Sequence, residues 1–219
     1  MREVWKRFAD EFGAQHTGVG EPYGINMLDK VVYEHQGVTI TLDSTRRGRK
    51  SVDTRIYAPV AVSENFNLNI LPNNFLTKFE KFFGMQDIEI GDLIFDEKLI
   101  VQSENPEKLK LFLSNQKVRE LLLAISSHHS LVDTLFGICL RVGETELAAR
   151  GNRGWRFDDL PCKGNYMVIM QNGMIDNAEL LKLSFQFAIE SLEQLKNRNN
   201  EFRCSSQQNL EIAETLLLG

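Results

Sequence analysis

The stretch Gly84–Leu113, GMQDIEIGDLIFDEKLIVQSENPEKLKLFL, carries the clearest structural signals in this chain. It alternates acidic and aliphatic residues through Asp87–Ile90 and then turns at Gly91-Asp92. We predict a strand over Leu93–Gln102, because aliphatic and aromatic residues are concentrated there. A helix should follow at Asn105-Pro106, where a good N-cap precedes a residue suited to the first helical position. A strand running into a capped helix indicates a mixed fold.

The sequence downstream of this stretch predicts two long helices and three strands. Each helix has an apolar face at helical spacing, and Asn172-Gly173 supplies the turn before the second one. Val142-Gly143 is interpreted as a turn between two strands. The predicted elements are helices at Pro106–Ser126 and about Asn177–Arg198, with strands at Ser130–Arg141, Glu144–Arg150 and Tyr166–Gln171.

Upstream, the apolar pattern changes from a helical period to a period of two. Residues 2–14 are amphipathic and predict an N-terminal helix, and a short helix is expected at Lys78–Phe83. Between them lie four β-branched and aromatic runs separated by turn residues, which is typical of an antiparallel meander. These runs are Val31–Tyr33, Val38–Leu42, Val52–Val60 and Phe66–Leu71.

Together these elements predict one α+β domain over residues 1–197, with a mostly antiparallel sheet from about residue 30. We expect six to nine strands with the two long helices packed on them. Residues 198–219 are interpreted as a flexible segment and a short helix-prone tail. The sequence around Asn105–Leu111 matches that around Asn177–Leu183 at five of seven positions. This leaves an internal pseudo-duplication open, although helix caps draw on few residue types and converge without common origin.

Composition indicates an ordinary globular chain rather than a disordered or membrane-spanning one. Of 219 residues, 42% are hydrophobic and 25% are charged, and the net charge of −5 argues against wholesale nucleic-acid binding. The three cysteines, Cys139, Cys162 and Cys204, are widely spaced. They fit a reducing compartment better than a disulfide scaffold or a zinc site. We therefore expect a cytoplasmic protein without a transmembrane segment, a bound metal or a cofactor.

A group of acidic residues inside the opening stretch is the strongest candidate for a metal-binding or catalytic site in the sequence. Asp87, Asp96 and Lys98 fit the loose acid and (D/E)-x-K arrangement of Mg²⁺-dependent nucleases, in which carboxylates hold the ion and the lysine lies beside the phosphate. The alternative is that the acids from residue 87 to 97 form the solvated face of a sheet. We favour the solvated face.

A basic cluster at Arg46, Arg47, Arg49 and Lys50 lies at the expected tip of a hairpin. Four cations could bind phosphate groups of a lipid surface or a nucleic acid. Exposed cations also keep the edges of a sheet from pairing with neighbours. Because the chain is acidic overall, only the local charge could attract a polyanion, and we favour the solvated tip.

Between Phe83-Gly84 and Phe95–Lys98 the chain resembles a bacterial family of uncharacterised proteins. The shared pattern is F-G-x-Q-D-I-E-I-G-D followed by a phenylalanine-aspartate pair, a strand and a helix, and the likeness spans roughly residues 30–197. The family has no assigned activity, cofactor or catalytic residue. The resemblance therefore implies a single domain and transfers no functional residue.

We expect a non-enzymatic binding or protein-interaction module, because no nucleophile elbow, phosphate loop or zinc cluster is present in the sequence. Leu216, Leu217 and Leu218 near the C-terminal end need a surface on which to bury. Self-docking or a homodimer is the favoured arrangement for them. The alternatives are a Mg²⁺-dependent phosphodiesterase or nuclease using Asp87, Asp96 and Lys98, and a peripheral binder of anionic lipid using the basic cluster.

Overall fold

An eight-stranded sheet lies at the centre of the computed structural model, which describes residues 2–17, 29–47, 51–61, 66–72, 88–128, 138–144 and 164–217. Every strand pairing in this part of the chain is antiparallel, apart from an isolated parallel bridge between Asp53 and Gly173. The predicted α+β class and the predicted strand number are therefore confirmed. The elements, in chain order, are α1 (Arg2–Phe12), β1 (Gln15–Thr17), β2 (Lys30–His35), β3 (Val38–Arg47), β4 (Ser51–Pro59), β5 (Phe66–Pro72), α3 (Leu93–Lys98), β6 (Leu99–Gln102), α4 (Pro106–Leu113), α5 (Gln116–His128), β7 (Ile138–Glu144), β8 (Asn165–Asn172) and α7 (Ala178–Leu217).

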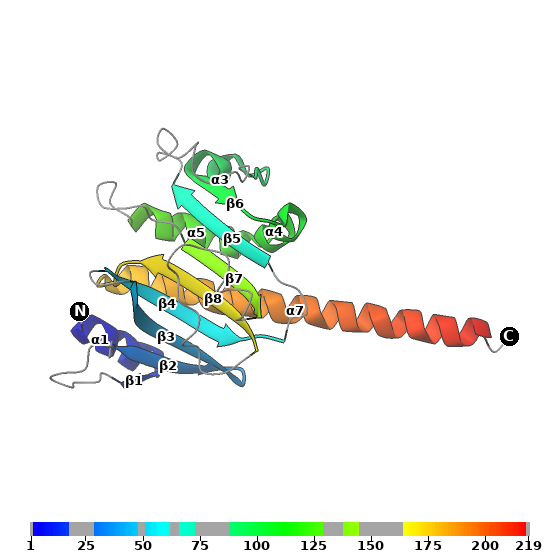
Figure 1. Ribbon diagram of the computed structural model, residues 1–219, viewed down its shortest axis with the longest axis horizontal. Coiled ribbons are helices and arrows are strands. Elements are labelled where there is room, and N and C mark those ends of the chain that lie inside the picture. The colour runs from blue at the N-terminus through cyan, green and yellow to red at the C-terminus, as the bar shows by residue number, and fades with distance from the viewer. Residues whose placement is uncertain are drawn as a thin grey trace.

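The strands lie in the order β1-β2-β3-β4-β8-β7-β5-β6, so the meander of β1 to β4 forms one half of the sheet. Its β2–β3 hairpin closes through Gln36-Gly37, where both residues have positive φ. Two such residues between antiparallel strands match the right-handed twist of the sheet. The strands β7 and β8 then join this meander to β5 and the edge strand β6 (Figure 1).

The hydrophobic core lies between one face of the sheet and helices α1, α5 and α7 (Figure 1). Trp5 of α1 donates its indole N–H to the carbonyl of Ile175 at 2.8 Å, which fixes α1 against the connection before α7. In the same core, Gln171 of β8 donates to the Ser184 hydroxyl of α7 at 2.7 Å. The largest fully buried side chains among the described residues include Trp5, Phe8, Phe95, Phe112, Phe185, Phe187, Ile40, Leu42, Ile56, Leu68 and Leu109.

The predicted strand over Leu93–Gln102 is wrong in its first part. Leu93–Lys98 forms helix α3, and only Leu99–Gln102 is a strand. Asp92 caps the helix by accepting a hydrogen bond from the Phe95 backbone N–H at 3.2 Å. A six-residue apolar and charged run fits either a helix or a strand by its period, and this cap favours the helix.

The single helix predicted over Pro106–Ser126 is also wrong, because the structure divides it into α4 and α5. Asn105 caps α4 as predicted, accepting from the Lys108 N–H at 3.1 Å. A second cap lies at Asn115, whose side chain accepts from the Lys117 N–H at 2.9 Å. The chain therefore bends between the two helices at a residue that competes for backbone hydrogen bonds.

The turn predicted at Val142-Gly143 is absent, because β7 runs through both residues to Glu144. Gly143 takes a φ of 136° inside the strand and still pairs with Tyr166. Glycine adopts this backbone conformation at little cost, because it has no side chain, and Gly143 can therefore remain part of the strand. The strand predicted at Tyr166–Gln171 is confirmed as β8, which also includes Asn172 of the predicted turn, and Gly173 follows it with a φ of 84°.

Helix α7 begins where predicted and then continues far beyond the predicted end. Asn177 accepts hydrogen bonds from the N–H groups of Glu179 and Leu180 at 2.9 and 3.0 Å. The segment 198–208, predicted to be flexible, is helical, and the helix reaches Leu217. Figure 1 shows the orange-to-red half of α7 extending well past the sheet.

Three predictions lie outside the described residues. These are the short helix at Lys78–Phe83, the strand at Glu144–Arg150 beyond its first residue, and most of the strand at Ser130–Arg141. The strand β1 was not predicted; it precedes the expected start of the sheet near residue 30 and pairs with β2.

Candidate functional site

Two acidic residues of the opening stretch, Asp96 and Asp92, stabilise a turn and cap a helix rather than line the face of a sheet. The carboxylate of Asp96 accepts hydrogen bonds from the backbone N–H groups of Ile90 at 3.1 Å and Gly91 at 2.9 Å. Gly91 has a φ of 83°, which the turn requires. Asp96 therefore closes the turn that precedes α3.

Asp92 has two bonds of its own. Besides capping α3, it forms an ion pair with Arg119 of α5, with its carboxylate oxygen 3.0 Å from Arg119 Nε. The Phe95 N–H, together with the Arg119 guanidinium, lowers the pKa of Asp92 below its ordinary value. Arg119 also donates to the carbonyls of Leu113 and Ser114 at 2.6 and 3.0 Å. This ion pair therefore joins α3 to the bend between α4 and α5.

Among the described residues, the geometry does not bring together Asp96 and Lys98 of the nuclease-like set. Asp96 and Lys98 lie two positions apart on α3, and residues at that spacing point to different sides of a helix. Lys98 is exposed, and Asp87 lies outside the described residues. Within the described part of the chain, no three histidine, cysteine or acidic side chains gather as metal ligands would.

The basic cluster lies at the end of the β3–β4 hairpin. The last pairs of this ladder are Arg46 with Val52 and Arg47 with Ser51. Arg49 and Lys50 belong to residues 48–50, which lie outside the described residues. The predicted position of the cluster at a hairpin end is thus consistent with the register of β3 and β4.

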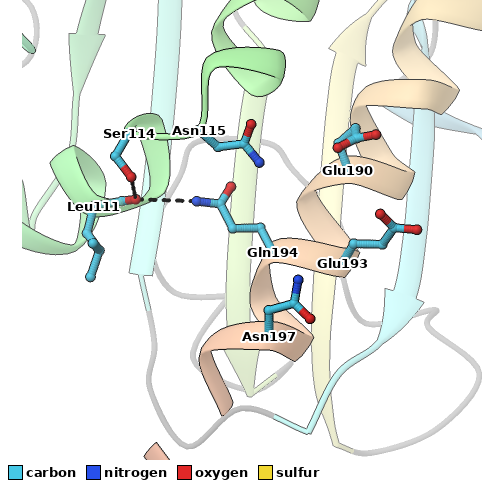
Figure 2. A pocket seen from close by; sticks show the side chains of 7 residues that line it. All are labelled: Leu111, Ser114, Asn115, Glu190, Glu193, Gln194 and Asn197. Atoms are coloured by element: carbon cyan, nitrogen blue, oxygen red, sulfur yellow. Dashed lines mark hydrogen bonds between the residues drawn. The ribbon is translucent and has the colours of Figure 1, made fainter. Parts of the chain in front are cut away.

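A crevice of about 340 Å³ opens between the α4–α5 bend and α7 (Figure 2). No sequence pattern pointed to it, because its residues form two groups, 111–115 and 190–197, that are more than 70 positions apart along the chain. Figure 2 shows the Gln194 side chain directed from α7 toward the end of α4. The crevice is lined by Leu111, Ser114, Asn115, Glu190, Glu193, Gln194 and Asn197.

The polar side chains of this crevice form hydrogen bonds and ion pairs that link the helices around it. Gln194 donates to the carbonyls of Leu111 at 3.3 Å and Phe112 at 2.8 Å, and so holds the end of α4. Lys117 forms an ion pair with Glu190, which raises the pKa of the lysine. Since these bonds join α4, α5 and α7, the crevice is primarily a helix joint.

The second carboxylate of the crevice reaches across to the sheet. Glu193 lies 2.8 Å from the ring nitrogen Nε2 of His35, and Gln36 donates to the same oxygen at 3.3 Å. His35 stacks beside Tyr33, with the ring centroids 6.1 Å apart. These contacts fix the β2–β3 hairpin to α7. No hydroxyl or thiol from the described residues joins His35 and Glu193 as a nucleophile would.

On the opposite face of the sheet lies a second buried cluster, Tyr57, Tyr166, Val168 and Met170. Arg55 lies over the Tyr57 ring, with its guanidinium carbon 5.0 Å from the ring centroid. The same guanidinium binds the Asp43 carboxylate in a two-point contact of 2.9 and 2.7 Å. Arg55 is thus a buried cation with its own counter-ion, which is a structural role.

The base of the projecting part of α7 adjoins the crevice. Leu195 is the last buried residue of α7 among those whose side chains are described, and Asn197 lines the crevice two residues later. Leu111 of α4 lies at the same place and is 51% exposed. The crevice therefore marks the point at which α7 leaves the domain. Residues 198–217 are called the α7 extension from here on.

Comparisons with known proteins leave the family of this chain open. No protein-family model and no curated protein matches it. A solved structure, that of the mycobacterial trehalose monomycolate transport factor A, TtfA, is similar over 90% of this chain and 92% of that one. Its TM-score is 0.43 and the sequences are 9% identical, so the likeness carries no functional argument. Among the described helices, none combines the length and apolarity needed to cross a membrane.

Proposed function

We propose that this chain is a non-enzymatic protein-interaction module that binds its partner through the α7 extension. The observation that supports this is the length of α7. It contains 40 residues, and among those whose side chains are described, up to residue 197, the last buried one is Leu195. The remaining 20 or so residues would form a rod of about 30 Å beyond the domain.

In proteins, most of the stability of a helix comes from packing one of its faces rather than from helix propensity. The domain itself covers the first half of α7, and Figure 1 shows no element of the described chain beside the second half. A binding partner would stabilise the extension by burying its apolar positions. The three cysteines of the sequence fit a reducing compartment, and we place this activity in the cytoplasm.

A photo-crosslinking amino acid placed at Ala213 tests the proposal in living cells. The matched control is the same amino acid at Gln186, which is exposed on the sheet-bound half of the same helix. We expect a discrete crosslinked product from position 213 and none from position 186. If position 213 gives no product although the chain folds normally, the extension has no partner and the proposal fails.

A second candidate function is binding to an anionic surface through the basic cluster. Its support is the β3–β4 register, whose last pairs put Arg46 and Arg47 at the end of the ladder; Arg49 and Lys50 follow them closely in the sequence. Such binding should weaken sharply with added salt, because exposed charges are screened.

Sedimentation with phosphatidylserine vesicles measures this second candidate. Replacing Arg46, Arg47, Arg49 and Lys50 by glutamine should abolish sedimentation, whereas a control replacing exposed Lys98 and Lys110 should retain it. Equal sedimentation of both variants would eliminate a lipid role for the cluster.

A further inference from the structure

The α7 extension is more basic near its start and acidic near its end. The first third contains Arg198 and Arg203, and Glu201 is the single acid there. From residue 204 to residue 217 the charged residues are Glu211 and Glu214, with no cation. A helix that is more basic at its start and acidic at its end is complementary to a second copy of itself running in the opposite direction.

The same segment repeats apolar residues at helical spacing. Positions 210, 213 and 217 follow the i, i+3, i+7 pattern of one helix stripe, and positions 202 and 216 lie beside it, on the side of position 213. These residues are Phe202, Leu210, Ala213, Leu216 and Leu217. Covering this set on two helices would bury on the order of 1,000 Å², which is near the lower limit for a stable interface.

We infer that the partner of the α7 extension is a second copy of this chain, bound antiparallel along the extension. This inference rests on the proposed function and names the partner. Full overlap of the two extensions puts their midpoint between residues 207 and 208. Arg203 of each copy then lies within one residue of Glu211 of the other. A parallel pair would instead set Arg203 beside Arg203 and Glu211 beside Glu211, which is unfavourable.

The antiparallel arrangement also accounts for an exposed leucine on the domain. In full overlap, Leu217 of one copy lies level with residue 198 of the other, at the base of the extension. Leu111 lines the crevice at that base and is 51% exposed. Two leucines near the end of one α7 would thus meet an exposed leucine of the second copy. The dimer would thereby bury apolar surface of Leu111 that is in water in the single chain.

Light scattering and cysteine crosslinking of the full chain test this inference. The native cysteines, Cys139, Cys162 and Cys204, are first replaced by serine. Single cysteines are then introduced as Ser206→Cys or Ala213→Cys, which are seven residues apart and so lie on one stripe of the helix. Full antiparallel overlap separates the two copies of position 206 by about three residues along the axis, or about 4.5 Å. The two copies of position 213 are about 16 Å apart along the axis.

We expect a mass of twice 25.1 kDa at micromolar concentrations, with a disulfide-linked dimer for S206C and none for A213C. Efficient linkage at both positions would indicate a parallel pair and overturn the antiparallel arrangement. A monomer at all concentrations would overturn the second copy as partner. The photo-crosslink at position 213 separates the two ideas, because a product of another mass preserves the proposed function and refutes the dimer.

A charge exchange supplies an independent check. Arg203→Glu should weaken the dimer by roughly five- to thirtyfold, since it replaces two attractive pairs by two repulsive ones. Adding Glu211→Arg to the same chain should restore most of the affinity. An unchanged dissociation constant in the single variant would remove the charge argument for the antiparallel orientation.

Discussion

Phe185 holds the sheet-bound half of α7 to the rest of the domain, and Phe185→Ala should destabilise the fold strongly. The ring is fully buried. It makes edge contacts with Phe8 and Phe12 of α1, at centroid distances of 5.2 and 5.5 Å, and with Tyr33 of β2 at 5.7 Å. One side chain of α7 thus joins a helix and a strand from the other end of the chain.

The expected loss in free energy of unfolding follows from the cavity that the substitution leaves. Removing a buried phenylalanine side chain costs about 3–5 kcal/mol, because apolar burial is lost and the surrounding atoms relax only partly. Three aromatic contacts disappear as well, and each is worth about 0.5–1.5 kcal/mol beyond its buried area. We expect the upper half of the range, about 4–5 kcal/mol, against a typical total stability of about 5–15 kcal/mol.

Urea unfolding monitored by far-UV circular dichroism measures this loss. Gln186→Ala is the matched control, since Gln186 is the exposed neighbour on the same helix, and its effect should stay within about 0.5 kcal/mol. A loss below about 1 kcal/mol for F185A would refute the packing argument. A double-mutant cycle with Phe8→Ala should then give a coupling of about 0.5–1.5 kcal/mol between Phe8 and Phe185.

Three further predictions concern caps and ion pairs. Asn177→Ala should lower the free energy of unfolding by about 1 kcal/mol in the same urea assay, because it removes the N-cap of α7. Asp43→Ala should cost about 1.5–3 kcal/mol, since it removes the two-point carboxylate contact of the buried Arg55 guanidinium, and a cost under about 0.5 kcal/mol would contradict that role. The contribution of Asp92 should be present above the carboxyl's unfolded-state pKa, near 3.9, and be lost as the pH falls through the lowered folded-state pKa. Asp92→Asn, which also weakens the pair with Arg119, should therefore destabilise the chain at pH 7 and converge with the unaltered chain at low pH in urea titrations.

Local signals in the sequence were reliable where short-range physics governs the structure. Asn105 was recognised as a cap by its position before an apolar helical pattern, and the helix predicted from about Asn177 begins at the next residue, with Asn177 as its cap. The period-two runs of β2, β3, β4 and β8 were placed to within two residues at most ends, since alternation reflects a sheet with one face against the core. The outline of the α+β fold could therefore be predicted.

Local signals failed where a short segment fits two structures equally well. Leu93–Lys98 has the composition of a strand but is a helix, and Asn115 interrupts what resembles one continuous helix. Gly143, a frequent turn residue, lies inside β7. In each case a single cap, backbone conformation or neighbouring strand outweighs the propensity of the segment.

The candidate site was beyond the reach of local patterns for a different reason. The crevice combines Leu111 and Ser114 with Glu190 and Glu193, and the distance between these positions along the chain leaves no periodic trace. The polar composition of residues 197–208 predicted flexibility, although the structure continues α7 through them to Leu217. Composition reports how well a segment is solvated, whereas its conformation also depends on the helix that precedes it, because elongating an existing helix avoids the cost of nucleation.

The amino-acid sequence alone was thus sufficient to predict the fold class, the starts of the helices and the alternating strands. These features depend on interactions between residues a few positions apart. The order of strands in the sheet, the pairing of Arg55 with Asp43 and the projection of α7 beyond Leu195 arise from contacts between distant segments. Such contacts form only when burial of the whole core offsets the entropy of closing long loops.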